Sequence, residues 1–304
     1  MKGKENMAVK KVEAVINGQT YTLTLNSATG KYEATITAPA KSSYNQTGGY
    51  YPVTIKATDD AGNTTTKDAT DSSLGSSLRL RVKEKVAPTI TVTYPTASAT
   101  LINNAPTIQW NVTDDDSGVN PDTIGITIDS GVKITGDSIK KAAITGGYNC
   151  TYTPTALSDG PHTIKFDASD HDGNAATQKS VTFKIDTVPP TLSVSSPSDG
   201  YITNKNTITV SGTTNDVTSS PVTVTVNGKE VTVGSNGTFS TDITLTSGSN
   251  TITVIAKDSA GKTTTITRTV KYDANPPKIT AANITPNPVG TGSTVVLSVT
   301  VTDD

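Results

Sequence analysis

The side chains best placed for chemistry are carboxylates that gather in predicted loops. Asp114, Asp115 and Asp116 follow one another, and Asp186 stands just before a proline-marked linker. Hard cations such as Ca²⁺ take carboxylate and carbonyl oxygens from flexible acidic loops. We therefore expect a calcium site built from these four residues and no other cofactor, although Asp, Asn and Gly also favour turns without any ion. Further carboxylates of this kind are Asp59, Asp60, Asp170, Asp172 and Asp273.

Catalytic chemistry has little support in the sequence. The chain has two histidines, His162 and His171, and one cysteine, Cys150. General acid–base and nucleophilic catalysis need a nucleophile, a base and an orienting group within reach of one another. Neither histidine stands near a nucleophile motif or in a metal-ligand spacing with the cysteine. Cys150 and Trp110 alternate with strand residues, which predicts that both pack in a core. We expect no catalytic residue and no enzymatic activity.

The elements that must position these loops are strands rather than helices. Hydrophobic residues are 33% and aromatic residues 5% of the 304 residues, while Gly (24) and Pro (16) are frequent. This composition favours strands and turns. No apolar run is long enough to predict a transmembrane helix, and a net charge of −2 with mixed signs leaves no basic patch for nucleic acid. Residues 1–6 lack the apolar run of a secretory signal.

Self-similarity divides the chain into modules. Residues 53–64, 164–175 and 252–263 each show a strand, an acidic turn with glycine and a second strand, which predicts a hairpin. Each hairpin is followed by an alternating strand and then by a proline junction, at Pro88, Pro190 and Pro277. The junctions are 102 and 87 residues apart. Either interval suits one seven-stranded β-sandwich.

These motifs resemble the bacterial immunoglobulin-like (Ig-like) repeat domains of surface adhesins, phage tail proteins and S-layer-type proteins. The matching residues are the Pro-Pro-Thr-Leu junction at 189–192, the Ala-x-Asp-x-x-Gly-Asn hairpin at 168–174 and the Val-Thr-Val-Asn-Gly strand end at 224–228. The resemblance implies an all-β chain of tandem Ig-like β-sandwiches. It also implies an extracellular location, on a cell-surface appendage or a virion, and it says little about chemistry.

The repeat pattern predicts two whole sandwiches, residues 87–187 (module 2) and 188–275 (module 3). Residues 1–86 (module 1) form an incomplete module, because residues 12–19 align with 222–229 and no counterpart of the first two sandwich strands, A and B, precedes them. Residues 276–304 (the terminal segment) supply an A strand near Ile279 and Ile284 and a B strand over 295–302. One sandwich is therefore predicted to be split between the N- and C-termini.

Apolar and polar residues alternate in the predicted B strand, which marks one buried face. Burying four such side chains would contribute roughly 6 to 12 kcal/mol before entropy costs. We expect the terminal segment to donate its strands to module 1, and Asp303 and Asp304 would then rebuild an acidic loop there. The predicted contact residues are Ile279, Ile284, Val295, Leu297, Val299 and Val301 of the terminal segment and Val12 and Val15 of module 1.

Three arrangements would complete the split sandwich. The terminal segment of one chain can insert into module 1 of the next, which gives a head-to-tail homopolymer. The chain can close on itself, which stiff proline junctions oppose, or the sequence can be a fragment of a longer repeat array. We predict the homopolymer, a filament subunit whose partner is itself, with no nucleic acid and no membrane insertion. The alternative is a stalk or binding region of an adhesin or phage tail protein that binds cell-envelope carbohydrate.

Overall fold

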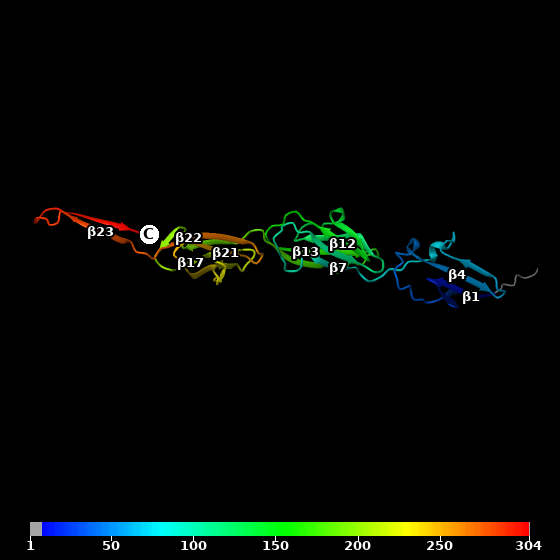
Figure 1. The fold of residues 1–304 in the computed structure, drawn as a ribbon. Helices are drawn as coiled ribbons and strands as arrows, with labels where there is room; N and C mark the ends of the chain where they lie inside the picture. Colours follow the sequence, from blue (N-terminus) through cyan, green and yellow to red (C-terminus); the bar gives the residue numbers. More distant parts are fainter. Residues whose placement is uncertain (1–7, 304) are drawn as a thin grey trace, which may run out of the picture. The chain divides into compact units, whose positions relative to one another are not determined.

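The computed structural model describes residues 8–303, and these residues form an all-β protein (Figure 1). Residues 1–6 and Asp304, for which expectations were stated above, lie outside the described residues. Within 8–303, no helix has the length and apolar character needed to cross a membrane. The chain packs as two compact units, one of residues 8–99, 105–157 and 161–183, the other of 100–104, 158–160 and 184–303. The predicted all-β chain of tandem Ig-like sandwiches is confirmed.

Module 2 is a sandwich of two four-stranded sheets, ordered β10-β13-β14-β8 and β11-β12-β9-β7. Trp110 of β9 and Phe166 of β13 meet between the sheets with ring centroids 5.3 Å apart, and both side chains are fully buried. Trp110 is therefore a core residue, as its alternation predicted. The strands are β7 (Thr89–Tyr94), β8 (Thr100–Leu101), β9 (Ile108–Thr113), β10 (Val119–Ile128), β11 (Lys140–Ile144), β12 (Gly147–Tyr152), β13 (Gly160–Asp170) and β14 (Lys179–Ile185); a 3₁₀ turn, η3 (Gly136–Ser138), precedes β11.

Module 3 is also a two-sheet sandwich, with sheets ordered β15-β17-β20 and β16-β22-β21-β18-β19. Its core is aliphatic and is built around Val210, Val224, Ile252 and Val254. These residues alternate along their strands, so each strand turns one face inward. The strands are β15 (Thr191–Ser196), β16 (Tyr201–Thr203), β17 (Thr207–Asn215), β18 (Thr223–Val226), β19 (Lys229–Val231), β20 (Thr238–Thr244), β21 (Gly248–Lys257) and β22 (Thr263–Tyr272).

Module 1 has one sheet, ordered β3-β2-β1-β4-β5, with β6 paired to β4. The turn Asn17-Gly18 joins β1 to β2 with positive φ at both residues, and Asn227-Gly228 joins β18 to β19 in the same way. By this turn and by the pairing order, β1, β2, β4 and β5 correspond to β18, β19, β21 and β22 of module 3. The elements are β1 (Val9–Ile16), β2 (Gln19–Asn26), β3 (Lys31–Glu33), η1 (Thr47–Gly49), β4 (Tyr51–Asp59), β5 (Thr64–Lys67), η2 (Gly75–Leu78) and β6 (Arg79–Leu80).

The last strand of module 1 differs from the prediction. The sequence pattern predicted one alternating strand from the hairpin to the proline junction, but residues 68–78 leave the sheet between β5 and β6. Asp68 accepts a hydrogen bond from the backbone N–H of Thr70, and Asp71 accepts from those of Ser73 and Leu74. Such aspartate turns compete with a strand ladder for the backbone donors, so the alternating strand expected after this hairpin is interrupted between β5 and β6.

The terminal segment forms a two-stranded antiparallel sheet, β23 (Lys278–Thr285) and β24 (Val296–Thr302), which we call the terminal hairpin (Figure 1, red). Every residue of both strands is exposed. A pair of strands without a covering layer is marginally stable in water. The terminal hairpin therefore differs from the strands of modules 2 and 3, each of which packs within a sandwich.

Candidate functional site

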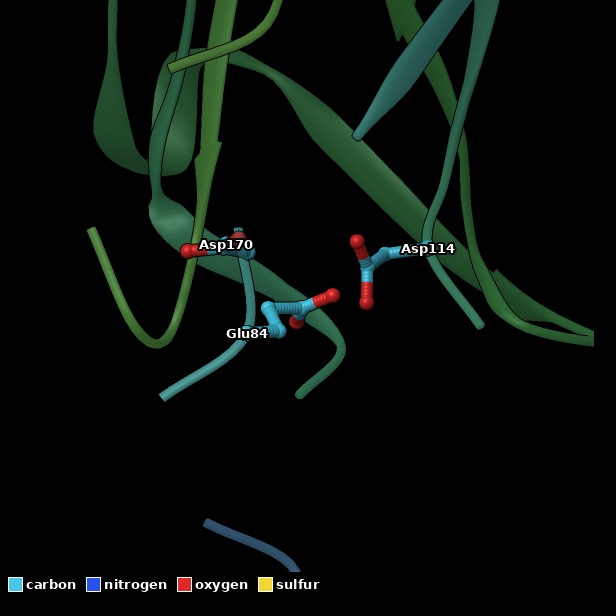
Figure 2. A group of neighbouring side chains, drawn as sticks. All are labelled: Glu84, Asp114 and Asp170. Carbon is cyan, nitrogen blue, oxygen red and sulfur yellow. The ribbon is translucent and has the colours of Figure 1, made fainter. Parts of the chain in front are cut away.

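Three carboxylates from separate segments converge beside module 2. Glu84 lies in the linker before β7, Asp114 directly follows β9, and Asp170 ends β13. One oxygen of each lies within 4.8 Å of the other two, and Figure 2 shows the three side chains gathered at this point. We call this group the first triad.

Local turns hold the first triad in place. Asp170 Oδ1 accepts a hydrogen bond from the backbone N–H of Asn174, and Asp170 Oδ2 accepts one from the Asn174 side chain. Gly173 has φ of 94° in this turn, a conformation that disfavours other residues. Asp114 Oδ1 accepts hydrogen bonds from the backbone N–H groups of Asp116 and Gly118. Both carboxylates are thus fixed by the turns that the sequence predicted.

Residues of module 1 contact the loops around the first triad. The backbone N–H of Ser42 donates to both carboxylate oxygens of Asp116, and the Ser42 hydroxyl donates to Asp172. The Tyr44 ring stacks on His171 with centroids 4.2 Å apart and planes 9° apart. The carboxylates of Asp116 and Asp172 therefore accept hydrogen bonds from Ser42 of module 1 and do not belong to the first triad.

A second triad has the same construction in the linker before module 3. Asp186 lies before β15, Asp216 directly follows β17, and Asp258 directly follows β21. One oxygen of each again lies within 4.8 Å of the other two, and all three residues are buried. Asp258 Oδ1 accepts from the backbone N–H of Lys262, and Asp216 Oδ1 accepts from those of Thr218 and Ser219. The turns that hold the first triad recur here.

Both triads bury oxygens that no hydrogen bond satisfies. These are Glu84 Oε2 in the first triad and Asp186 Oδ2 and Asp258 Oδ2 in the second. Buried polar atoms without partners are rare and costly. Carboxylate oxygens within 4.8 Å of one another also repel by at least about 3 kcal/mol per pair of charges at an effective dielectric constant of about 20. A cation between them would remove both costs, and two oxygens that ligate one Ca²⁺ at about 2.4 Å are at most about 4.8 Å apart.

The four predicted metal ligands do not form one site. Asp114 belongs to the first triad and Asp186 to the second. Asp115 is exposed, and the Asp116 carboxylate accepts hydrogen bonds from the backbone N–H of Ser42. The prediction of a single four-residue set is wrong, because each linker brings its acidic residue to the loops of the module that follows it.

Sequence reasoning missed Glu84, Asp216 and Asp258. A signal for the first of them was present, because Glu84 and Asp186 each stand four residues before the junction proline, at Pro88 and Pro190. Asp258 holds the same place before its hairpin glycine as Asp170 does. Comparing equivalent positions between repeats would have found these two residues without coordinates.

The terminal hairpin gathers its apolar side chains on one face. Leu297 lies opposite Ile284, Val299 opposite Ala282 and Val301 opposite Ile279. Residues directly opposite each other share a face of the sheet. The register shifts between Ile279 and Ala281, and this bulge brings Ile279 to the same face as the others although its sequence parity differs. The predicted residues Ile279, Ile284, Leu297, Val299 and Val301 therefore lie together, and Val295 directly precedes β24 on the same parity.

Module 1 offers an unpaired segment where module 3 has a strand. Gly30 and Tyr32 precede residues 34–40 in the same spacing as Gly237, which directly precedes β20, and Phe239, its second residue. In module 3, β20 pairs with β17 along seven residues, whereas residues 34–40 belong to no strand. A groove of about 540 Å³ opens between these residues and the turn after β1, lined by Ile16, Tyr21 and Ile36 among others.

The two predicted contact residues of β1 face opposite ways. Val12 is buried on the face that it shares with Ala14 and Ile16. Ile16 lines the groove, so this is the face of β1 that the groove adjoins. Val15 is three residues from Val12, so it lies on the other face, where it is half-buried. Val12 belongs with the apolar face of module 1, and Val15 lies on the opposite face; that either residue contacts a second copy stays a prediction.

The residues considered for catalysis lie in structural roles. His162 is buried, and its Nδ1 lies 2.8 Å from Asp129 Oδ2. Burial raises the pKa of Asp129, but hydrogen bonds from the Thr163 N–H and from His162 outweigh that effect and lower it. Cys150 is fully buried, and desolvation raises the pKa of its thiol to about 11. A buried, protonated thiol is a weak nucleophile, and the predicted packing of Cys150 in the core is confirmed.

Comparisons with known proteins agree with this architecture. Residues 100–187 match the family described as bacterial Ig-like domain, and residues 190–274 match the family described as glucodextranase, domain B. Among curated proteins, Bacillopeptidase F of Bacillus subtilis (strain 168) is 32% identical over 154 residues, 51% of this chain. The match spans 10% of that protein's length, so the chain corresponds to a small part of this relative.

Solved structures with similar folds include titin and bacterial modules. The titin I-band fragment I67–I69 is 13% identical, with a TM-score of 0.44 over 87% of this chain and 88% of that one. The fibronectin(III)-like modules of Clostridium thermocellum CbhA are 17% identical, with a TM-score of 0.34 over 61% of this chain and 94% of that one.

Proposed function

We propose that this chain, a protein of tandem bacterial Ig-like repeats, is a structural subunit that assembles head to tail outside the cell. The terminal hairpin of one copy would pack on module 1 of the next and supply its A and B strands. The observation that supports this most directly is complementarity: the terminal hairpin has the strands that module 1 lacks within the described residues. This contact joins two different surfaces, so repetition gives an open filament or a ring.

The pairing in module 3 predicts the register of the contact. There, Ser211 of β17 lies opposite Ser240 of β20. The 87-residue spacing of the junction prolines makes Ser298 the counterpart of Ser211. The alignment of Tyr32 with Phe239 makes Glu33 the counterpart of Ser240. We therefore propose that Ser298 of one copy lies opposite Glu33 of the next, with backbone pairing along residues 31–36.

The energy available suits a reversible but firm contact. Five large side chains of the terminal hairpin face are about half exposed or more: Ile279, Ile284, Leu297, Val299 and Val301. Burying their exposed parts would contribute roughly 4 to 8 kcal/mol before the entropy of association is subtracted. Main-chain hydrogen bonds to residues 31–36 would add to this, as in other cases of strand addition.

A disulfide cross-link tests the proposed register. We expect the double variant Ser298→Cys with Glu33→Cys to form, on mild oxidation, a ladder of bands at multiples of the chain mass, because opposite residues of paired strands suit a disulfide. The native Cys150 is buried and does not compete. The matched control is Ser298→Cys with Thr22→Cys, an exposed position on β2, which should give no covalent ladder on a denaturing gel.

Other outcomes would contradict the proposal. A cross-linked monomer would show that the chain closes on itself. A monodisperse, uncross-linked monomer at high concentration would leave the stalk or carbohydrate-binding region of an adhesin or phage tail protein as the better hypothesis. Electron microscopy of the uncross-linked protein would then show single particles instead of filaments or rings.

A further inference from the structure

The acidic residue four positions before the junction proline recurs at the third junction. Glu84 and Asp186 occupy this position in the two triads, and Asp273 occupies it before Pro277. The backbone N–H of Asp273 donates to Thr203 O at 2.9 Å, as that of Asp186 donates to Leu101 O at 2.9 Å. Asp273 Oδ1 also accepts from the second residue after it, as Asp186 Oδ1 does. Asp273 is therefore held in the same way as a triad residue.

The terminal hairpin supplies a counterpart of the second triad residue, the aspartate that follows the B strand. In module 2, Ile90 pairs with Val112, and Asp114 follows two residues later. In the terminal hairpin, Ile279 pairs with Val301, and Asp303 follows two residues later. Ile90 and Ile279 each stand two residues after their junction proline. Asp303 thus corresponds to Asp114, and through the same register to Asp216 of module 3.

Module 1 supplies a counterpart of the third triad residue, the aspartate of the hairpin. Asp59 receives a hydrogen bond from the backbone N–H of Asn63 at 2.8 Å and one from the Asn63 side chain at 2.9 Å. Asp170 receives the same two bonds from Asn174. The Asn63 side-chain bond also lowers the pKa of Asp59. Asp59 therefore has the geometry of the hairpin member of a triad, and among residues 8–303 no group of three converging carboxylates includes it.

We infer that the contact between two copies of the chain completes a third carboxylate triad that binds a divalent cation, with Asp273 and Asp303 from one copy and Asp59 from the next. This inference rests on the proposed head-to-tail assembly, because the three residues meet only when the terminal hairpin docks on module 1. The cation would then link neighbouring subunits directly, and assembly would depend on its concentration.

The two existing triads support a cation rather than a cluster of turn residues. Asp186 is fully buried and Asp258 is 4% exposed, yet each has an oxygen without a hydrogen-bond partner. The hydroxyls of Ser117 and Ser219, at equivalent places in the two loops, are also buried without partners. Turn formation explains the bonded oxygens but not these unpartnered ones. A bound cation would give all of them a ligand role.

The chemistry favours Ca²⁺ over Mg²⁺ and transition metals. All the available ligands are oxygens, from carboxylates and hydroxyls, which hard cations prefer. The ligands come from three separate segments with irregular geometry, which suits the larger and more flexible coordination of Ca²⁺ better than the strict octahedron of Mg²⁺. At the third triad, Asp273 Oδ2 lies 3.8 Å from Lys271 Nζ. That exposed contact is weak, and Ca²⁺ can displace it.

Calcium titration of the full-length chain tests the inference by counting sites. We expect about two Ca²⁺ per chain while the chains are held apart by dilution, and about three per chain after assembly, because the third triad needs two copies. With Ca²⁺ at about 100 times its Kd for that site, the association constant should rise roughly 100-fold over that in EDTA. Sedimentation velocity measures association, and isothermal titration calorimetry measures the number of bound ions.

Single substitutions separate the third triad from the other two. Asp59→Asn and Asp303→Asn should each remove the calcium dependence of association while leaving about two bound ions per chain. Asp60→Asn is the matched control, because Asp60 is exposed beside Asp59 and belongs to no triad. Mixing the Asp59→Asn and Asp303→Asn proteins should restore calcium-dependent dimers but not long assemblies. Only one contact in such a mixture pairs an intact Asp59 with intact Asp273 and Asp303.

Failure of the inference and failure of the proposed function look different. Assembly of equal strength in EDTA and in Ca²⁺, with no effect of Asp59→Asn, would overturn the cation while leaving head-to-tail assembly in place. An equal number of bound ions before and after assembly would do the same. If the chains do not associate under any condition, the shared site cannot form and both proposals fall.

Discussion

Strands β7 and β9 of module 2 and strands β23 and β24 of the terminal hairpin share one design. Ile90 lies opposite Val112 in the first pair, and Ile279 lies opposite Val301 in the second. Yet Ile90 is 3% exposed, whereas Ile279 is 71% exposed. In module 2 the second sheet covers the apolar face, and in the terminal hairpin no strand of the described chain does so. The difference shows that the strand pair alone sets the register, while burial needs a second layer.

In the proposed assembly, module 1 is the partner of the terminal hairpin. Its sheet matches the larger sheet of module 3, but residues 34–40 remain unpaired where β20 pairs with β17. An open strand edge with an incomplete core tends to bind another strand. In the proposed assembly these two regions, from neighbouring copies, would form one sandwich like the whole modules 2 and 3.

The largest expected effect is the difference in stability between variants of the two matched isoleucines, Ile90 and Ile279. Ile90→Ala should destabilise module 2 by about 2 to 5 kcal/mol, because it leaves a cavity in a closed core. Ile279→Ala should change the stability of the unassembled chain by less than about 0.5 kcal/mol, because the side chain is already in water. Differential scanning calorimetry in EDTA measures both. Similar losses in the two variants would mean that the terminal hairpin is already buried in the free chain.

An intermediate effect concerns association. Leu297→Asp should weaken association at least about 100-fold, because it would bury a charge in the proposed contact, whereas Val296→Asp should weaken it far less. Val296 neighbours Leu297 on β24 and faces the other side, so it is the matched control. Sedimentation velocity compares the variants. Equal effects of the two substitutions would place the contact elsewhere on the chain.

The smallest expected effect is on the alkylation rate of a thiol, which differs between the covered sheet of module 2 and the uncovered terminal hairpin. Cys150 lies opposite Trp110 in the closed sheet, and its pKa is raised to about 11 by burial. Its alkylation should be slow at pH 8 and rise with pH toward about 11. The folded chain keeps the Cys150 thiol protonated at pH values where the unfolded chain has lost this proton. The stability of module 2 should therefore fall as pH rises from the ordinary thiol pKa toward about 11.

The Ser298→Cys variant provides the open counterpart of Cys150. In dilute protein the exposed thiol that it introduces should react at the rate of a free cysteine, and assembly should slow it as residues 31–36 cover β24. Mass spectrometry after timed alkylation measures both sites in one experiment. Fast reaction of Cys150, or slow reaction of the thiol introduced by Ser298→Cys in the dilute protein, would contradict the structural contrast between the two sheets.

Much of the fold could be predicted because its signals are local. Alternation of apolar residues placed Trp110 in a core, and the acidic glycine turns within 53–64, 164–175 and 252–263 marked hairpins. The interruption of the last strand of module 1 could not be predicted from alternation alone. It depends on Asp68 and Asp71 competing for backbone donors, which pattern counting does not weigh.

The candidate sites were predicted less well. The sequence indicated acidic loops and singled out Asp114 and Asp186, but it assigned both to one site together with Asp115 and Asp116. Glu84 entered the first triad only in the structure. Val12 and Val15 were predicted together as contact residues, whereas their separation of three residues puts them on opposite faces of β1.

The sequence by itself determined the number of repeats, their hairpins and the strands of the terminal segment, because these depend on residue type and spacing along the chain. Only the tertiary structure decided which carboxylates meet and which apolar faces stay open. Both depend on segments far apart in the sequence: Glu84 reaches Asp170 through the fold, and the bulge after Ile279 turns its side chain to the face of Val301. Residue spacing alone does not encode those contacts, because they arise from how strands pair and sheets stack.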